Sequence, residues 1–543
     1  MVFARRSTTL LAAIIASCAM VLSLTACPSD NKTVVDGQTT VTSNSAGGVA
    51  VFTPSDGITL NQQTPLNKWA KLVPDLAKAL ADAGFKKGDI NHTTSDSLDK
   101  QSRAIQDFVV DHLSNNTTDD SGIAIAPDNM TLLVAPVVEA DASTRQYGDY
   151  VSQNLSTNDV TDEGATSDGE SSEDDSSKDD SSNTESDSTA SDEQAQAVDR
   201  LVSSLKLAKE SGMHVVLLGN SIEGYKPDAF VKFSDAQTIG KLQAEKMVSK
   251  LKLDKASKDN PKYIEVLLPY TAMDEKGNAN DSTFAQEAFR GIWQVLGSYY
   301  QKGVVESPSG TLDGKSTEND WQAVAYDAAK EGSTAKVLDK RLAKTDGQST
   351  LTRIDGIITM NDYIASEVVK ELDDLGYTGS AADINPQITI SGIVGNITGK
   401  KDLSRDAVPD PIKSPENDNA NDSSSSDDDA DEDTSASDKD RDSQWPLVTG
   451  YGAYVSNIPS IVNGKQWMTG MEDRQTIATD IAQACAKLNK DEALNSMPSI
   501  RNSEVGGVKK IPTISEPLLA VSASNLKSAL IDPGYISLAD AGL

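Results

Sequence analysis

Cysteine is scarce in this chain. Its 543 residues include three cysteines, at positions 18, 27 and 485. Cys18 lies within an N-terminal apolar run that is expected to be removed, and Cys27 directly follows this run. Cys485 is then the one thiol left for the folded part, where its pattern indicates a small buried residue on a helix. An intramolecular disulfide is therefore excluded.

Histidine is equally rare, and the common catalytic motifs are missing. The three histidines, His92, His112 and His214, are scattered and form no Ser-His-Asp or Cys-His set. There is no HExxH, CxxC or P-loop pattern. Paired carboxylates are abundant only in the Ser- and Asp-rich tracts, which offer no fixed geometry for acid–base catalysis. The sequence predicts neither an enzyme nor a bound cofactor or metal.

An excess of positive charge is also missing. Asp and Glu number 82 against 49 Lys and Arg, so the formal net charge is −33. This balance argues against nucleic acid as a partner, because phosphate binding needs clustered basic residues. The one long apolar run, Leu10–Leu24, is too short for a membrane span.

The N-terminus has the pattern of a secretory signal. Two arginines precede the apolar run, which ends in Leu-Thr-Ala-Cys27. This ending matches the bacterial lipobox, in which the peptide is cut before the cysteine and the thiol carries a diacylglycerol. We expect a signal peptide over 1–26, lipidation of Cys27 and a polar tether over 27–47. The alternative is an ordinary signal peptide with a chance cysteine.

Two acidic stretches interrupt the rest of the chain, at 139–196 and 403–444. Between Asp159 and Glu193 nearly every residue is Asp, Glu, Ser, Thr or Gly. Such segments bury too little apolar surface to offset the entropy of ordering, so both are predicted to be disordered. Calcium binding is not indicated, because the spacing of an EF-hand loop is absent.

Strand and helix patterns alternate outside these stretches, which predicts βαβ units and parallel sheets. One strand falls either at Gly122–Pro127 or at Thr131–Pro136, and the second is preferred for its continuous apolar run. About 350 structured residues exceed one core, so two lobes are expected. The other predicted strands are Gly48–Phe52, His214–Leu218, Tyr263–Leu268, Ile354–Thr359, Ile388–Ile393 and Pro446–Thr449.

The stretch Trp445–Ala478 is the most informative segment. Its strand runs into the turn Gly450-Tyr451-Gly452. A strand that leaves a sheet through such a turn is where α/β proteins place ligands.

Several segments match one known family in order and spacing. They are Lys68-Trp69, Phe233–Asp235 with Gly240–Ala244, Trp321, Ile354–Asp362, Ser460–Gln466 and Glu472-Asp473. With them the chain resembles the type I periplasmic binding proteins of ABC sugar importers, especially the xylose and multiple-sugar-binding branch. The resemblance implies two doubly wound α/β lobes joined by three crossings, with the ligand held between them.

The resemblance also implies a division of the chain. The first lobe would take 48–219 and 451–504, and the second lobe 220–450 and 505–543. Ligand contacts would come from Lys68, Trp69, Asn220, Trp321, Asn361, Asp362, Tyr451 and Asp473.

Within this set, the aromatic rings of Trp69 and Trp321 would stack on a sugar, while Asn361 and Asp362 would bond its hydroxyls. Each tryptophan is equally compatible with core packing. Asn361 and Asp362 are also suited to cap the helix that follows them.

The chain departs from the family pattern at three places. Gly219-Asn220 stands where the family has Asp-Arg, Tyr451-Gly452 where it has Gln-Asp, and Glu472 where it has Lys. Two charged hydroxyl partners and one cation are missing, so a pyranose, a different ligand or none remain open.

The expected function is that of a monomeric binding protein, lipid-anchored at the outer face of the bacterial cytoplasmic membrane. It would capture a monosaccharide or related small polar solute and deliver it to an ABC permease. The alternative is a sensory or partner-docking surface lipoprotein with a degenerate cleft.

Overall fold

The computed structural model describes residues 34–35, 38–39, 46–55, 65–115, 125–138, 142–156, 185–273, 280–328, 330–343, 351–382 and 445–543. Cys27, the predicted strand Ile388–Ile393 and the acidic stretch 403–444 lie outside these ranges. The chain has two compact units, divided after Asn44. The first holds an antiparallel pair, β1 (Val34–Val35) and β2 (Gln38–Thr39).

The second unit contains a seven-stranded sheet, here called with its helices the first lobe. The strand order is β17-β18-β9-β7-β5-β3-β4, and neighbours are parallel except β17 and β18. The bounds are β3 Gly48–Pro54, β4 Ile90–Ser95, β5 Met130–Val134, β7 His214–Leu218, β9 Ala229–Lys232, β17 Ile500–Val505 and β18 Val508–Ser515. Of the two candidates for one strand, Thr131–Pro136 is therefore confirmed.

Alternating side chains place two hydrophobic clusters on the two faces of this sheet. Val49, Val51 and Leu133 pack with α1 (Trp69–Asp82) and α12 (Arg474–Leu488). Ala50 and Leu132 pack on the other face with α2 (Leu98–Asn115) and α4 (Glu185–Glu210). Cys485 is buried in the first cluster, as expected.

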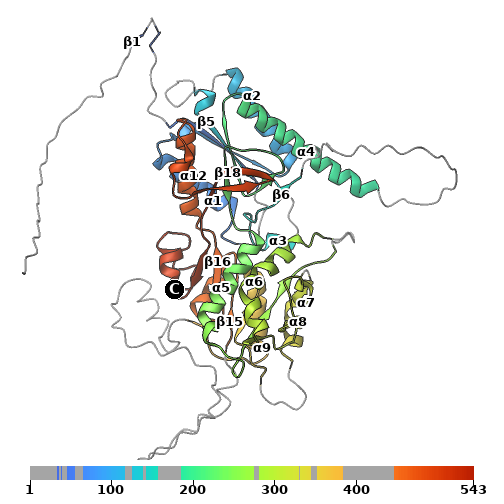
Figure 1. Ribbon diagram of the computed structural model, residues 1–543. Coiled ribbons are helices and arrows are strands. Elements are labelled where there is room, and N and C mark those ends of the chain that lie inside the picture. Colours follow the sequence, from blue (N-terminus) through green and yellow to red (C-terminus); the bar gives the residue numbers. More distant parts are fainter. Residues whose placement is uncertain are drawn as a thin grey trace, which may run out of the picture. The chain divides into compact units, whose positions relative to one another are not determined.

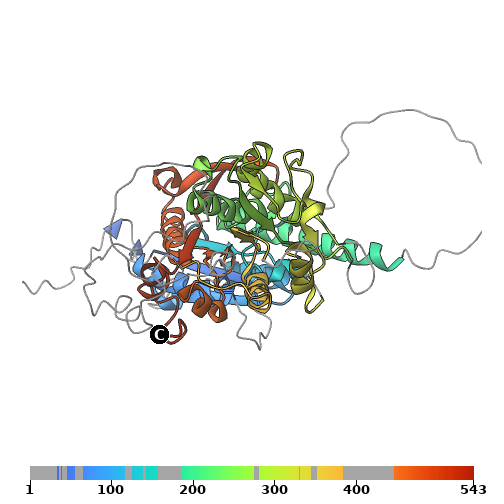
Figure 2. The same cartoon turned by 90° about the horizontal axis from the view of Figure 1, so that it is seen from below.

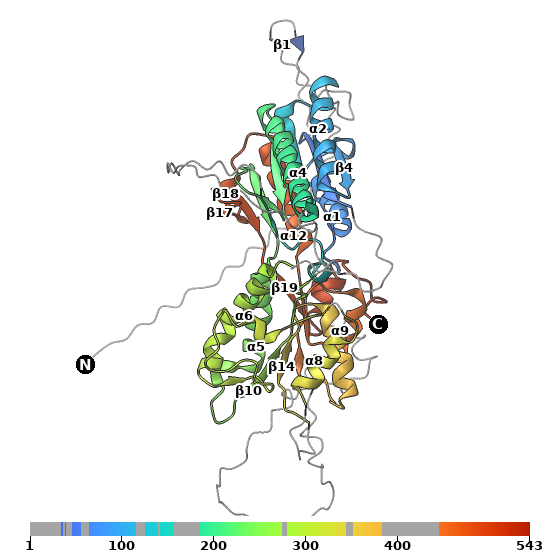
Figure 3. The same cartoon turned by 90° about the vertical axis from the view of Figure 1, so that its right-hand side faces the viewer.

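Sequence-distant helices meet on these faces. Helices α1 and α12 lie side by side, as do α2 and α4 (Figure 1, Figure 3). Figure 2 shows the fold from below, with orange to red C-terminal segments beside blue N-terminal ones. The C-terminal part of the chain therefore completes the lobe that the N-terminal part begins.

A four-stranded parallel sheet, ordered β12-β10-β14-β15, forms the centre of the second lobe. Its strands are β10 Lys262–Val266, β12 Val305–Glu306, β14 Gly356–Ile358 and β15 Leu447–Val448. Its helices are α5 Ala236–Leu251, α6 Thr283–Gln301, α7 Trp321–Val324, α8 Ser333–Arg341, α9 Asp362–Asp374 and α11 Ile458–Val462.

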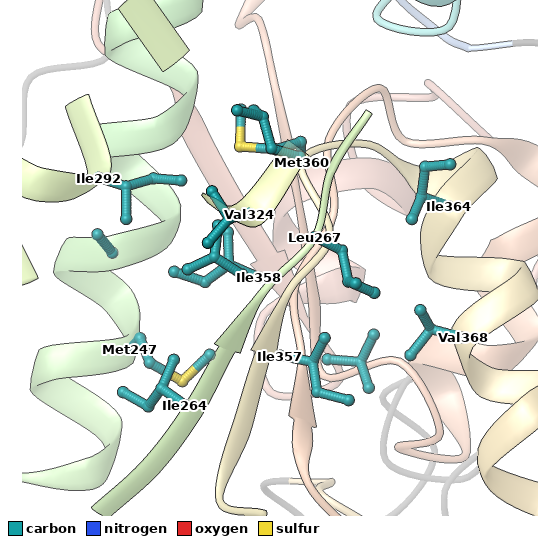
Figure 4. Close-up of a cluster of buried hydrophobic side chains, with 14 of the residues drawn as sticks. Met247, Ile264, Leu267, Ile292, Val324, Ile357, Ile358, Met360, Ile364 and Val368 are labelled. Carbon is teal, nitrogen blue, oxygen red and sulfur yellow. The ribbon is translucent and has the colours of Figure 1, made fainter. Parts of the chain in front are cut away.

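Successive residues of β14 serve opposite faces of this sheet. Figure 4 shows Ile357 directed toward Val368 of α9, whereas Ile358 points to the side of Ile292 of α6. Both strand residues are fully buried. Such a strand, apolar on both faces, is what a parallel sheet covered by helices requires.

Short pairs complete the fold. They are β6 (Asn154–Leu155) with β8 (Ser221–Ile222), β11 (Leu268–Pro269) with β13 (Ala325–Tyr326), and β16 (Met468–Met471) with β19 (Leu519–Ser522). A four-residue helix, α3 (Ala142–Arg145), precedes β6, and a π-helix spans Lys527–Ile531. The α/β class is thus confirmed.

The expected lobe boundaries need correction. The first sheet includes β9, so its first part continues to Lys232 instead of ending at 219. The chain returns to this lobe at α12, after residue 471, and β18 keeps it there until Ser515. The expected boundaries at 219, 451 and 505 are therefore misplaced. Short strands such as β9 carry little sequence pattern, so the sheet to which they belong could not be predicted.

Candidate functional site

A short stretch of chain, residues 144–155, lies against the carboxyl ends of the first-lobe strands. It is here called the bridging segment. β7 ends at Leu218, and Asn220 follows it with 4% of its surface exposed. Asn220 Nδ2 donates to the Pro136 carbonyl beyond β5 at 2.9 Å. Its Oδ1 accepts the backbone N–H of Gln153 at 3.0 Å. Asn220 thus fixes the bridging segment to two strand ends.

Asp149 of the bridging segment binds the start of α1. Its two carboxylate oxygens accept from Lys68 Nζ at 2.8 Å and from the Trp69 backbone N–H at 3.0 Å. α1 has no capping side chain of its own. Because the first N–H groups of a helix lack partners and carry partial positive charge, an anion there is stabilising. Asp149 supplies both the acceptor and the charge.

The Trp69 ring is packed between aromatic side chains. It is 3% exposed and makes edge contacts with Tyr150 and Phe233, at centroid distances of 5.0 and 5.7 Å. Tyr150 itself stacks on Phe233 at 4.8 Å and donates a hydrogen bond to the Lys68 carbonyl. The indole therefore packs against protein rings in this structure.

The second lobe holds the other end of the bridging segment. Asn361 caps α9 by accepting the Ile364 N–H at 2.9 Å, and its Nδ2 donates to Gln146 Oε1 at 3.1 Å. Tyr454 donates its hydroxyl proton to the Gln146 carbonyl at 2.7 Å. The helix-capping role expected for Asn361 is confirmed, and the residue contacts the bridging segment as well.

Aromatic packing strengthens this second contact. The ring of Tyr147 lies 4.7 Å from Phe284 and 6.3 Å from Tyr451. Tyr147 and Val151 belong to the second-lobe core, whereas Tyr150 belongs to the first-lobe core. The bridging segment is therefore buried against both lobes.

This order corrects the expectation of disorder over 139–196, at least for 142–156 and for the helix from residue 185. The acidic composition of the wider range hid the segment. A usable signal was present: Gln146-Tyr147-Gly148-Asp149-Tyr150-Val151 carries two tyrosines and a valine, unlike the Ser- and Asp-rich sequence after it. These residues were missed as part of the site.

Glu472 is buried where the chain passes from β16 to α12. Its Oε1 accepts the Ser234 N–H at 2.6 Å and lies 3.4 Å from the Tyr451 hydroxyl, which also bonds Ser234 Oγ. Burial raises the pKa of Glu472 to about 7. Burial, with the Glu472 carboxyl nearby, raises the pKa of Tyr451 well above its ordinary value. The cluster joins residues on two connections between the lobes.

Asp362 is engaged inside the second lobe. Its oxygens accept from the Tyr454 N–H at 2.9 Å, Gln466 Nε2 at 2.7 Å and Thr469 Oγ1 at 2.9 Å. Burial raises its pKa to about 6. These bonds tie the start of α9 to the chain after β15.

Three of the expected ligand residues, Asp362, Trp321 and Asp473, have no described bond to the bridging segment. Trp321 begins α7 and meets the Tyr270 ring edge-on at 5.2 Å. Asp473 caps α12, accepting from Thr476 Oγ1 at 2.8 Å and from the Tyr535 hydroxyl at 3.0 Å. Of the eight predicted residues, the bridging segment contacts Lys68, Trp69, Asn220, Asn361 and Tyr451.

Two surface cavities lie away from this contact region. One is lined by residues that include His214, Asp228 and Asp491, and the other by apolar residues beside His92 and Lys87. Neither includes a residue of the bridging segment. Within the ranges described, no group of three His, Cys, Asp or Glu side chains is placed to hold a metal ion. No helix there is long and apolar enough to cross a membrane.

Comparison with known proteins gives a likeness in fold. No protein-family model and no curated protein matches the chain. Among solved structures, it is similar to an ABC transporter solute-binding protein from Clostridium phytofermentans with bound β-D-glucose. The identity is 17%, the TM-score is 0.44, and the match covers 91% of this chain and 99% of that one.

Other solved structures give similar values. A carbohydrate transporter solute-binding protein from Chloroflexus aurantiacus, in complex with D-glucose, is 16% identical, with a TM-score of 0.43 and coverage of 92% and 98%. An arabinose-binding protein from Geobacillus stearothermophilus is 10% identical, with a TM-score of 0.42 and coverage of 89% and 99%. At this identity the likeness concerns the fold alone, and no ligand or site residue is inferred from it.

Proposed function

We propose that this protein is an extracellular binding protein that holds a small polar solute, a monosaccharide or a related compound, between its two lobes. One observation carries the proposal. Side chains at the strand ends and helix starts of both lobes contact one short part of the chain, the bridging segment. A solute in that place would contact both lobes at once, which is the condition for ligand-stabilised closure.

The chemistry of the surrounding residues suits a sugar. Asn220 and Asn361 offer amide groups, and Tyr451 and Ser234 offer hydroxyls, all of which form hydrogen bonds with sugar hydroxyls. Trp69 offers an aromatic face of the kind that packs on the apolar side of a sugar ring. The amides and the indole contact the bridging segment itself, so a solute would use the same groups.

The remaining parts of the proposal come from the sequence. Lipidation at Cys27 would hold the protein at the outer face of the membrane, where a monomer would deliver its solute to an ABC permease. A binding protein of this kind has no catalytic role. Lys68, Trp321, Asp362 and Asp473 are proposed to position the residues that surround the solute.

Calorimetry with purified protein tests the solute-binding function. A panel of pentoses, hexoses and nucleosides should contain at least one compound that binds with 1:1 stoichiometry. Asn361→Ala should weaken that binding by about tenfold or more, because it removes one hydrogen-bonding group. Gln294→Ala, on the exposed face of α6, is the control. If no compound binds, solute delivery is the wrong function.

A second function is favoured by the same segment. Because Tyr147 and Tyr150 are each 1% exposed, the interlobe space is well filled by the chain itself. A sensory or partner-docking surface protein needs no free cleft. A partner recovered with the intact chain, together with no binding from the solute panel, would favour this alternative.

A further inference from the structure

The polar groups around the bridging segment are incompletely satisfied. Asn67 is 1% exposed; its carbonyl accepts the Asp149 N–H at 2.8 Å and its Oδ1 accepts the Glu472 N–H at 3.3 Å. Its Nδ2 has no acceptor within the described part of the chain. The buried hydroxyl of Ser152 also has no hydrogen-bond partner there. Buried polar groups without partners are unfavourable. The segment therefore fits this place imperfectly.

The bonds that hold the segment are divided between the lobes. The first lobe accepts the N–H groups of Asp149, Ser152 and Gln153, the last on the Asn220 side chain. The second lobe contributes two hydrogen bonds to Gln146 and the packing of Tyr147. Val151 also packs in the second-lobe core, so the segment leaves its place only when its contacts with the second lobe and its hydrogen bonds to the first lobe both break.

We propose that the bridging segment is a displaceable internal occupant of the solute site, which a solute replaces when it binds. The inference rests on the proposed function for the identity of the solute. A hydroxyl oxygen of the incoming solute takes the Asn67 Nδ2 donor that the segment leaves without an acceptor. The arrangement is autoinhibitory, because the segment occupies the same Asn220 and Asn361 amides that a solute needs.

Competition of this kind lowers the apparent affinity for solute. Only molecules in which the segment has left are competent to bind, so the apparent Kd equals the intrinsic Kd divided by the competent fraction. Weakening the segment's hold on the second lobe raises this fraction. The affinity for solute then improves although no residue lining the lobes has changed.

Hydrogen exchange on the protein without added solute tests whether the segment leaves. The amides of Asp149, Ser152 and Gln153 should exchange at least about a hundredfold faster than those of Leu132 and Val134 in β5, through a local opening that is insensitive to denaturant. Exchange at the β5 rate, with the same dependence on denaturant, would overturn the proposal, since the segment would then open only on global unfolding.

Two variants of one residue sharpen the test. Tyr147→Ala removes the ring that packs on Phe284 and Tyr451, and should speed exchange at Ser152 and Gln153 by about tenfold or more. Tyr147→Phe keeps the ring and should exchange like the unmodified protein. Tyr299→Ala, on α6 away from the segment, is a matched control for the loss of a tyrosine.

Solute addition separates this inference from the proposed function. D-Glucose and the other compounds of the panel are the probes. A compound that binds and removes the protection of Asp149 and Gln153 supports both. A compound that binds while that protection is unchanged overturns the inference and leaves the function standing. Local opening without any binding compound supports the displaceable segment and contradicts the solute function.

Discussion

At the scale of single residues, the buried carboxyl of Glu472 makes stability depend on pH. In the folded protein its pKa is about 7, against an ordinary value of 4.5. The folded state therefore binds a proton that the unfolded state has lost, and the stabilisation is fully present below pH 4.5. It is lost as the pH rises to 7, by up to about 3 kcal/mol.

Replacing Glu472 by glutamine should remove this contribution. Glu472→Gln keeps an oxygen to accept the Ser234 N–H but cannot ionise. We expect the variant to exceed the unmodified protein in free energy of unfolding at pH 8, and the difference to shrink toward pH 5. Urea unfolding at both values measures this.

A second buried carboxyl, Asp362, titrates in the same pH range, and an exposed carboxylate provides the control. Asp362, with its pKa of about 6, gives a loss of the same sign between pH 3.8 and 6, but both proteins contain it, so it cancels from the difference between them. Glu318→Gln changes an exposed carboxylate and should have the same effect at both pH values. If Glu472→Gln also changed the free energy of unfolding equally at pH 5 and pH 8, the raised pKa assigned to Glu472 would be contradicted.

The candidate site was predictable in part at this scale. Trp69, Asn220, Asn361 and Tyr451 follow strands or open helices, and the carboxyl ends of parallel strands meet at one edge, so their convergence follows from general rules. The bridging segment does not. Tyr147 and its neighbours are ordered by tertiary contacts with both lobes, and nothing local in the sequence specifies those partners.

At the scale of elements, α5 and α6 approach each other through glycine. A Cβ built on Gly291 would lie 2.0 Å from the Gln237 carbonyl oxygen of α5. Gly291→Ala should therefore lower the free energy of unfolding by about 1–3 kcal/mol, because one helix must move away. This loss outweighs the roughly 1 kcal/mol that alanine gains over glycine in a helix.

Urea midpoints measure this effect. Gln294→Ala, three residues on at an exposed position of α6, should stay within about 0.5 kcal/mol of the unmodified protein. A Gly291→Ala protein as stable as that control would mean that the contact between the helices yields without cost.

The elements themselves were largely predictable. β7 has the bounds expected from its apolar run, His214–Leu218, and β5 follows the continuous run of the two candidates. Such strands are apolar on both faces, which leaves a clear pattern. β9 has four residues and β17 alternates weakly, so the lobe boundaries, which depend on them, were misplaced.

At the scale of the whole molecule, the lipid anchor is testable. Cys27→Ser removes the thiol that would carry the diacylglycerol, and a chain without an acyl anchor loses most of its membrane affinity. In detergent phase partitioning, the unmodified protein should enter the detergent phase and Cys27→Ser the aqueous phase. Cys18→Ser should behave like the unmodified protein. Identical partitioning of all three would contradict lipidation at Cys27.

The split of the first lobe along the chain bears on the order of folding. The apolar face of α1, with Leu72, Leu76 and Leu80, is covered by Ile477 and Ile481 of α12. Ribosomes make α1 early and α12 only after most of the second lobe. During synthesis, the leucines of α1 therefore stay exposed until α12 is made. Exposed apolar surface of this kind favours aggregation and chaperone binding. Completion of the first lobe therefore waits until α12 has been synthesised.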